Sequence, residues 1–206
     1  VKMGVYAMEA KTMTISGGSI SEVQTGITMS GSGKLVVNNK ARIEFTSGGT
    51  RNYGIGVGNG VTANITGAEI TGGGQGTGVY ATGAKAVTME EVRISNVAMG
   101  VEVKGGILAM KGGSIGFTGD YGISLKEGGA ALKDVNITGQ GHETEVAVKA
   151  VMGTVAIKGG EMSNVGTGVE VKSEGAVWLV DTKLRGVYKG VSVEDGVVHM
   201  EGGEIG

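Results

Sequence analysis

The sequence predicts an all-β fold, a right-handed parallel β-helix (solenoid) of about nine coils with three short strands per coil. Three observations lead to this prediction. Glycine supplies 43 of the 206 residues, while proline and cysteine are absent. A short apolar cassette recurs nearly from end to end. Within each cassette apolar and polar residues alternate with period two, as in a strand with one buried face.

The composition distinguishes a repeat from a disordered chain. Apolar residues make up 40% and charged residues 18% of the sequence, which is too hydrophobic and too weakly charged for a solvated low-complexity chain. Only 4% is aromatic, so we expect small and branched aliphatic side chains to fill a narrow, layered core. The formal net charge of −2 gives no overall attraction to nucleic acid or to an anionic membrane. Any electrostatic function must therefore come from local charge patterns.

The repeat has the pattern Gly-Val-x-Val, with glutamate in place of glycine on one coil. Two further apolar elements follow, five residues apart on every coil except the one around residues 35–45. A unit of about 22 residues cannot bury its own apolar face, so successive coils must stack at about 4.8 Å to share one core. We expect the first strands of the coils at Gly4-Val5, Gly26-Ile27, Gly54-Ile55, Gly78-Val79, Gly100-Val101, Gly122-Ile123, Glu145-Val146, Gly168-Val169 and Gly190-Val191.

Glycine pairs such as Gly112-Gly113 and Gly159-Gly160 separate the strands, where tight corners often need positive φ. On alternate coils, pairs such as Asp134-Val135 replace them. No run of about 20 apolar residues is present that could span a bilayer, and no signal peptide is recognisable. We therefore expect residues 1–206 to be a single β-helix segment of a longer protein, not inserted in a membrane, with any signal peptide or anchor outside it.

The sequence offers little for catalysis. Asp134 and Asp181 share a column with Glu91, but the alternation of coils separates them by two coils, roughly 10 Å, and we interpret them as solvated turn residues. His142 and His199 belong to no set with metal-ligand spacing. The glycine-rich stretch 72–78 is followed by neither a helix nor a Gly-Lys-Ser/Thr motif, so we expect a corner loop rather than a phosphate site. We expect no enzyme, no cofactor and no metal.

Two lysine columns are the main candidates for binding, because equivalent positions of successive coils lie side by side. Stacked like charges repel, so such a column invites either an anionic partner or a neighbouring acidic column. The alternative is a face that only solubilises the sheet. The first column comprises Lys104, Lys126, Lys149 and Lys172, and the second Lys111, Lys133 and Lys158. Candidates for the acidic column are Glu102, Glu127, Glu170 and Glu174.

The single tryptophan, Trp178, falls in an outward column, close to Lys158. An exposed tryptophan next to lysine is typical of an interaction hot spot. The alternative is that a loop from a neighbouring coil covers the indole. The full column reads Thr88, Ala109, Ala131, Ala156, Trp178 and His199.

Several cassettes resemble those of autotransporter passenger domains, with the greatest similarity to the Bartonella angiogenic factor A type. They include residues 76–81, 87–89, 110–115 and 166–171, and the resemblance extends through essentially the whole chain. It implies a passenger exported through the outer membrane by a C-terminal β-barrel, and hence a secreted or bacterial cell-surface virulence factor. For the angiogenic members it further implies a non-enzymatic ligand that activates the vascular endothelial growth factor receptor on host endothelial cells.

Two other functions remain open. The chain could be an adhesin that recognises extracellular matrix or sulfated glycans, in which case binding should weaken steeply with salt. Less favoured is a polysaccharide lyase or hydrolase, since many β-helices are such enzymes. The resemblance provides no motif of receptor-contacting residues, so the candidate partner-binding residues are the seven lysines of the two columns and Trp178.

Overall fold

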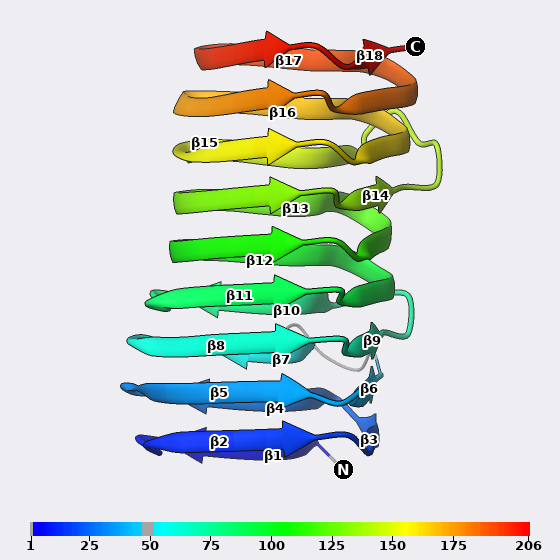
Figure 1. The fold of residues 1–206 in the computed structure, drawn as a ribbon. Coiled ribbons are helices and arrows are strands. Elements are labelled where there is room, and N and C mark those ends of the chain that lie inside the picture. Colours follow the sequence, from blue (N-terminus) through cyan, green and yellow to red (C-terminus); the bar gives the residue numbers. More distant parts are fainter. Residues whose placement is uncertain (1, 47–51) are drawn as a thin grey trace.

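The computed structural model describes residues 2–46 and 52–206. In this part of the chain the strands pair in parallel and stack as a β-solenoid of about nine coils, which confirms the predicted fold class (Figure 1). The near strands run from left to right while the chain climbs from the N- to the C-terminus, so the coils wind in a right-handed sense (Figure 1). None of the described residues is helical.

Each coil contributes one strand to each of three faces, although in the C-terminal half single strands bend around corners and serve two or three faces. The strands of the first face are β1 (Met3–Met8), β4 (Thr25–Ser30), β7 (Tyr53–Val57) and β10 (Thr77–Thr82). Those of the second are β2 (Thr12–Ser16), β5 (Gly33–Asn38), β8 (Val61–Thr66) and β11 (Ala86–Glu90). Those of the third are β3 (Ser19–Val23), β6 (Arg42–Phe45), β9 (Glu69–Thr71), β14 (Asn136–Thr138) and β18 (Glu204–Ile205). The strands that bend around corners are β12 (Arg93–Lys111), β13 (Ser114–Lys133), β15 (Val146–Lys158), β16 (Glu161–Val180) and β17 (Lys183–Glu201).

The core is one continuous set of aliphatic stacks along the solenoid axis. On the first face Ile55, Val79, Val101 and Ile123 occupy equivalent positions of successive coils and are fully buried. Burying an aliphatic side chain of this size stabilises the fold by about 1.5 to 3 kcal/mol. No coil can bury these side chains without its neighbours. Because inward and outward residues alternate along each strand, the stacking of the core also places the outward-facing residues of successive coils side by side.

From Val92 onward, side chains fill the corner after the second face only on alternate coils. Val92 is fully buried there, whereas the next coil has Gly113 at the equivalent place. A Cβ on Gly113 would lie 2.2 Å from the carbonyl oxygen of Val92, so no side chain fits. Glu91 precedes Val92 and adopts a positive φ of 52°. The predicted alternation of glycine pairs with larger residues therefore has a steric cause.

The expected irregularity around residues 35–45 is confirmed. Val37 stacks on Ile15 and Ile65, and Ile43 stacks on Ile20 and Ile70, so the two elements of this coil are six residues apart instead of five. The additional residue is accommodated at the corner, where Asn39 and Lys40 both have positive φ.

One predicted strand position is wrong. Ala147, and not Glu145, lies at the first-strand position between Gly122 and Gly168, because Val148 pairs with Ile123 and Val169. The repeat element in this coil therefore starts two residues later than predicted. A shift of two residues keeps the same side chains facing inward, so the alternation of apolar residues cannot reveal it.

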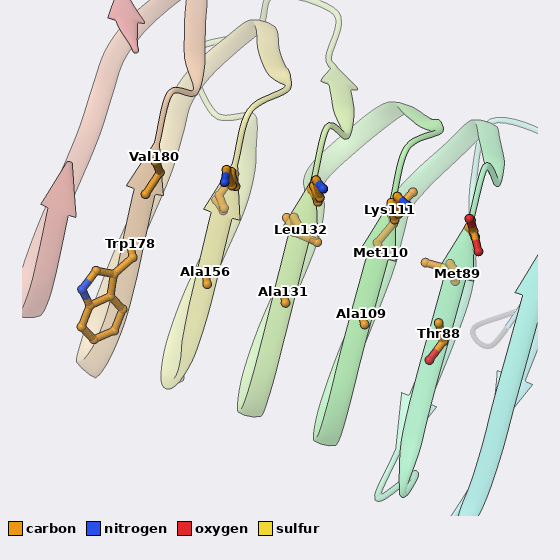
Figure 2. A pocket seen from close by; sticks show the side chains of 14 residues that line it. Thr88, Met89, Ala109, Met110, Lys111, Ala131, Leu132, Ala156, Trp178 and Val180 are labelled. Carbon is orange, nitrogen blue, oxygen red and sulfur yellow. The ribbon is translucent and has the colours of Figure 1, made fainter. Parts of the chain in front are cut away.

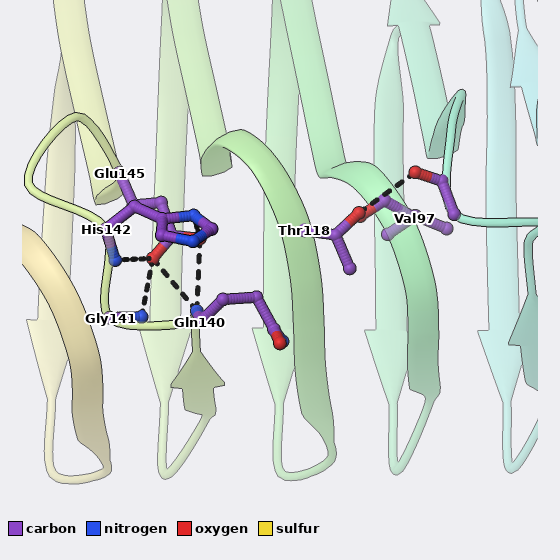
Figure 3. A network of polar contacts seen from close by, with 7 residues as sticks. Val97, Thr118, Gln140, Gly141, His142 and Glu145 are labelled. Carbon is purple, nitrogen blue, oxygen red and sulfur yellow. Dashed lines mark hydrogen bonds and ion pairs between the residues drawn. The ribbon is translucent and has the colours of Figure 1, made fainter.

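Glu145 instead closes the loop 139–145. Its side chain is almost completely buried and accepts hydrogen bonds from the backbone N–H groups of Gln140, Gly141 and His142 at 2.9 to 3.1 Å (Figure 3). The Nδ1 atom of His142 lies 3.4 Å from the same carboxylate.

On the neighbouring coils, the Thr118 hydroxyl donates to the carbonyl oxygen of Gly74 at 2.9 Å. Residues 72–76 form the predicted corner loop between β9 and β10, whereas Thr77 and Gly78 of the predicted stretch already belong to β10.

Candidate binding surface

The first predicted lysine column is not continuous. Because Ala147 is the start of its coil, Lys149 stacks between Ser124 and Glu170 in the middle of the first face. Of the other three members, Lys104 pairs with Glu127 instead of Lys126, because the register shifts after Val103, and Lys172 pairs with Glu194. The prediction that all four lysines share one column is therefore wrong.

All four of these lysines, called the paired lysines below, contact glutamates. The Glu102 carboxylate lies 3.6 Å from the ammonium group of Lys104 and 3.4 Å from that of Lys126. The Glu170 carboxylate lies 3.4 Å from both Lys149 and Lys172, and Lys172 also lies 3.6 Å from Glu194. Glu102 and Glu170 are the acidic neighbours expected from the sequence. Among the described contacts, Glu127 and Glu174 form no ion pair.

Tyrosines hold two of the paired lysines in place. The ammonium group of Lys104 lies 5.3 Å from the centre of the Tyr80 ring, which in turn stacks on Tyr53. The ammonium group of Lys149 lies 4.7 Å from the centre of the Tyr121 ring and donates a hydrogen bond of 2.9 Å to its hydroxyl oxygen. These tyrosines were not among the predicted site residues, although their outward strand positions were a signal that could have identified them.

These contacts raise the pKa of two lysines. For Lys104, the hydrogen bond to Tyr80 is the main cause and the charge of Glu102 adds to it. For Lys149, burial lowers the pKa, but the hydrogen bond to Tyr121 and the charge of Glu170 together outweigh it, so the net shift is upward. Both ammonium groups are thus stabilised by the protein itself.

The second lysine column forms as predicted. Lys111, Lys133 and Lys158 follow one another in register on β12, β13 and β15, and all three are exposed. Glu90 precedes this column and Val180 follows it. Within residues 2–46 and 52–206, none of these three ammonium groups lies within 4 Å of a carboxylate; they are called the groove lysines below.

The predicted tryptophan column also forms. Thr88, Ala109, Ala131, Ala156 and Trp178 stack in register, followed by His199. The Trp178 side chain points outward from β16 (Figure 2), and the residue is 42% exposed. No loop of residues 2–46 or 52–206 covers the indole, which was the alternative considered for this residue.

Together the two columns form a groove of about 490 Å³ on the second face (Figure 2). We call it the alanine–lysine groove. Its floor is made of three alanines, its border of the three groove lysines, and its two ends of Thr88 and Trp178. The volume lies within the range of about 300 to 1,000 Å³ that is typical of ligand sites. The outward-facing residues that line it are Thr88, Glu90, Ala109, Lys111, Ala131, Lys133, Ala156, Lys158, Trp178 and Val180.

The carboxylates at the corner after the second face do not come together as a site. The corner positions of Glu91, Asp134 and Asp181 alternate with those of Gly112 and Gly159, so these carboxylates lie two coils apart, roughly 10 Å, as predicted. Across the described part of the chain, no three His, Asp or Glu side chains are arranged to hold a metal ion. No helix long and apolar enough to cross a bilayer occurs in that part either.

Comparison of the chain with protein-family models, curated proteins and solved structures gives no match. Evidence on function therefore comes from the contrast between the paired lysines and the groove lysines.

Proposed function

We propose that the chain is a non-enzymatic binding module that engages a host cell-surface partner through the alanine–lysine groove. One observation carries this proposal. The groove lysines form an exposed column without carboxylate partners among the described residues, and an exposed tryptophan lies at one end of it. The paired lysines, in contrast, are already neutralised within the protein.

The groove lysines are unfavourable for the isolated protein. Successive coils place their side chains about 4.8 Å apart along the sheet, and like charges in directly adjacent positions are destabilising. An anionic partner would relieve this repulsion, and Trp178 supplies the large amphipathic contact area that interaction hot spots commonly use. The groove therefore combines charge complementarity with an anchoring side chain.

The sequence resemblance supports an extracellular setting for this module. On that basis we propose a secreted or surface-displayed autotransporter passenger, with the vascular endothelial growth factor receptor as the first candidate partner. The solenoid would present the groove on a rigid rod of roughly 40 Å for nine coils at about 4.8 Å each. An adhesin that binds sulfated glycans is the second candidate, and the groove lysines favour it.

Binding to endothelial cells at physiological salt tests the proposal. The groove variant K111E/K133E/K158E should bind at least tenfold more weakly than the wild type, since rim charges govern encounter and electrostatic attraction. The matched control K11E/K34E/K189E changes the net charge equally, at exposed positions elsewhere, and should bind normally. A groove variant that binds like the wild type would refute the proposal. Binding of the receptor ectodomain and receptor phosphorylation, measured with the same variants, test the candidate receptor.

A further inference from the structure

The strands beneath the groove restrict what can occupy it. β12, β13, β15 and β16 are each paired on both sides at this face, so their backbone N–H and C=O groups are used within the sheet. A peptide adding to a sheet requires a free strand edge, and the groove has none. A peptide lying on the alanine floor would bury its own backbone groups without partners, which is costly.

The floor suits a ligand with one flat apolar side and polar groups along its rim. Ala109, Ala131 and Ala156 offer only methyl groups, and Trp178 adds an aromatic surface at one end. A sugar ring has such a shape, because its C–H groups lie on one side and its hydroxyl or sulfate groups project at the edge. Pyranose rings lie on aromatic and small aliphatic surfaces without needing backbone hydrogen bonds from the protein.

The border specifies the charge of the ligand. The ammonium groups of Lys111, Lys133 and Lys158 are aligned along the solenoid axis, and the outer two are two coils apart, roughly 10 Å. This span is comparable to one disaccharide unit of a linear polysaccharide. A linear chain with an acidic group on each sugar would therefore place its charges next to successive lysines. The neighbouring acidic groups, Glu90 at one end and Asp134 at the adjoining corner, form no ion pair with these lysines.

We propose that the alanine–lysine groove binds a linear sulfated or carboxylated glycan, lying along the solenoid axis with its acidic groups on the groove lysines and one sugar ring against Trp178. This inference rests on the proposed function and takes the second of its two candidate partners, a sulfated glycan, as the class of ligand that occupies the groove. Such a ligand does not need a free strand edge, and its acidic groups provide partners for the three lysine ammonium groups.

The single tryptophan of the chain provides a direct readout of the groove. Heparin oligosaccharides serve as the probe, neutral dextran as the uncharged control and poly-glutamate as the acidic peptide. Heparin should change the emission of Trp178 and protect it from acrylamide quenching, whereas dextran should do neither. The groove variant K111E/K133E/K158E should bind heparin about 30-fold more weakly, because each lost ion contact contributes a few-fold in affinity. The charge-matched control K11E/K34E/K189E should retain wild-type affinity.

Either of two results with the purified protein would overturn the inference. Equal heparin affinity of the groove and control variants would show that the protein binds heparin elsewhere or through charge alone. Poly-glutamate that binds more tightly than heparin and protects Trp178 would identify an acidic peptide as the ligand class.

Cells treated with heparinase separate this inference from the proposed function. Loss of wild-type binding after treatment, together with weak binding of the groove variant to untreated cells, supports both. Binding that requires the groove lysines but survives heparinase and chondroitinase treatment supports the cell-surface function and overturns the glycan. Binding that depends neither on the groove lysines nor on the enzymes overturns both.

Discussion

The paired lysines and the groove lysines lie on adjacent faces of the same coils but have opposite surroundings. Two residues before Lys104 and Lys172, on the same outward side of the strand, come Glu102 and Glu170. Two residues before each groove lysine comes an alanine instead. Residues two apart share one side of a strand, so Lys104 and Lys172 meet a glutamate of their own strand. Lys126 and Lys149, preceded by Ser124 and Ala147 instead, meet a glutamate of an adjacent coil. A lysine column therefore indicates a binding surface only when the column beside it is uncharged.

The largest effect expected from this contrast is the decrease in stability when Glu170 is removed. E170A leaves the ammonium group of Lys149 half-buried without its counter-ion, and it removes one partner of Lys172. Breaking such a pair, discounted for its partial exposure to solvent, should lower the free energy of unfolding by about 2 kcal/mol. Chemical denaturation followed by circular dichroism measures this change.

The matched control for this variant is E201A, which removes a carboxylate from the exposed column that continues the groove lysines. It should change the free energy of unfolding by less than about 0.5 kcal/mol. If E170A were as stable as E201A, the glutamates would not be essential partners, and the distinction between the two lysine sets would fail.

The next effect compares equivalent substitutions of one lysine from each set. K149M keeps most of the aliphatic contact but loses the hydrogen bond to Tyr121 and the ion pair with Glu170, so it should lower the free energy of unfolding by about 1 kcal/mol. K133M removes a charge from between Lys111 and Lys158 and should leave stability unchanged or slightly higher.

Heparin affinity should respond in the opposite order, since K133M should weaken it and K149M should not. Thermal unfolding and heparin titration of the same two proteins check both halves of this prediction. A large loss of stability in K133M, or a loss of heparin affinity in K149M, would contradict the assignment of roles.

Much of this surface follows from the sequence, because column membership depends only on the repeat. The groove lysines and the column of Trp178 are in register as predicted. Both predictions rest on the second and third apolar elements of the repeat, which lie five residues apart in these coils. Lys149 was misplaced because the alternation of apolar residues is unchanged by a shift of two. Only the buried Glu145, which bonds three backbone N–H groups of its own loop, fixes the start of that coil.

The groove itself was beyond the sequence analysis for a different reason. Its columns were recognised separately, but the hollow arises because a column of small side chains lies beside a column of large ones on the same face. The three alanines beside the three lysines and the tryptophan at the end supply that contrast in size. Reading two neighbouring outward columns together would have predicted it.

A smaller effect concerns alkaline pH. Because the pKa of Lys149 is raised in the folded protein, its contribution to stability is complete below the ordinary lysine pKa of about 10.4 and is lost as the pH rises through the folded-state value. The difference in unfolding free energy between the wild type and K149M should therefore be constant from neutral pH to about pH 10 and should shrink above it.

Y121F removes the hydrogen bond that contributes most to raising the pKa, so in this background the alkaline decrease should be smaller. Denaturation curves of the wild type, K149M, Y121F and the double variant Y121F/K149M, collected across the alkaline range, measure both differences. A difference that grows with pH would mean that Lys149 is destabilised in the fold, which contradicts its pairing with Glu170 and Tyr121.

The smallest effect is the repulsion among the groove lysines themselves. At about 0.01 M salt the Debye length is about 30 Å, far longer than the spacing of about 4.8 Å between coils, so the three charges interact almost unscreened. K133Q removes the central charge and should raise the free energy of unfolding by a few tenths of a kcal/mol under these conditions. At about 1 M salt, where the Debye length is about 3 Å, this advantage should vanish. If K133Q had no advantage at low salt, the ammonium groups would be far enough apart to avoid one another, and a ligand would gain little by lying between them.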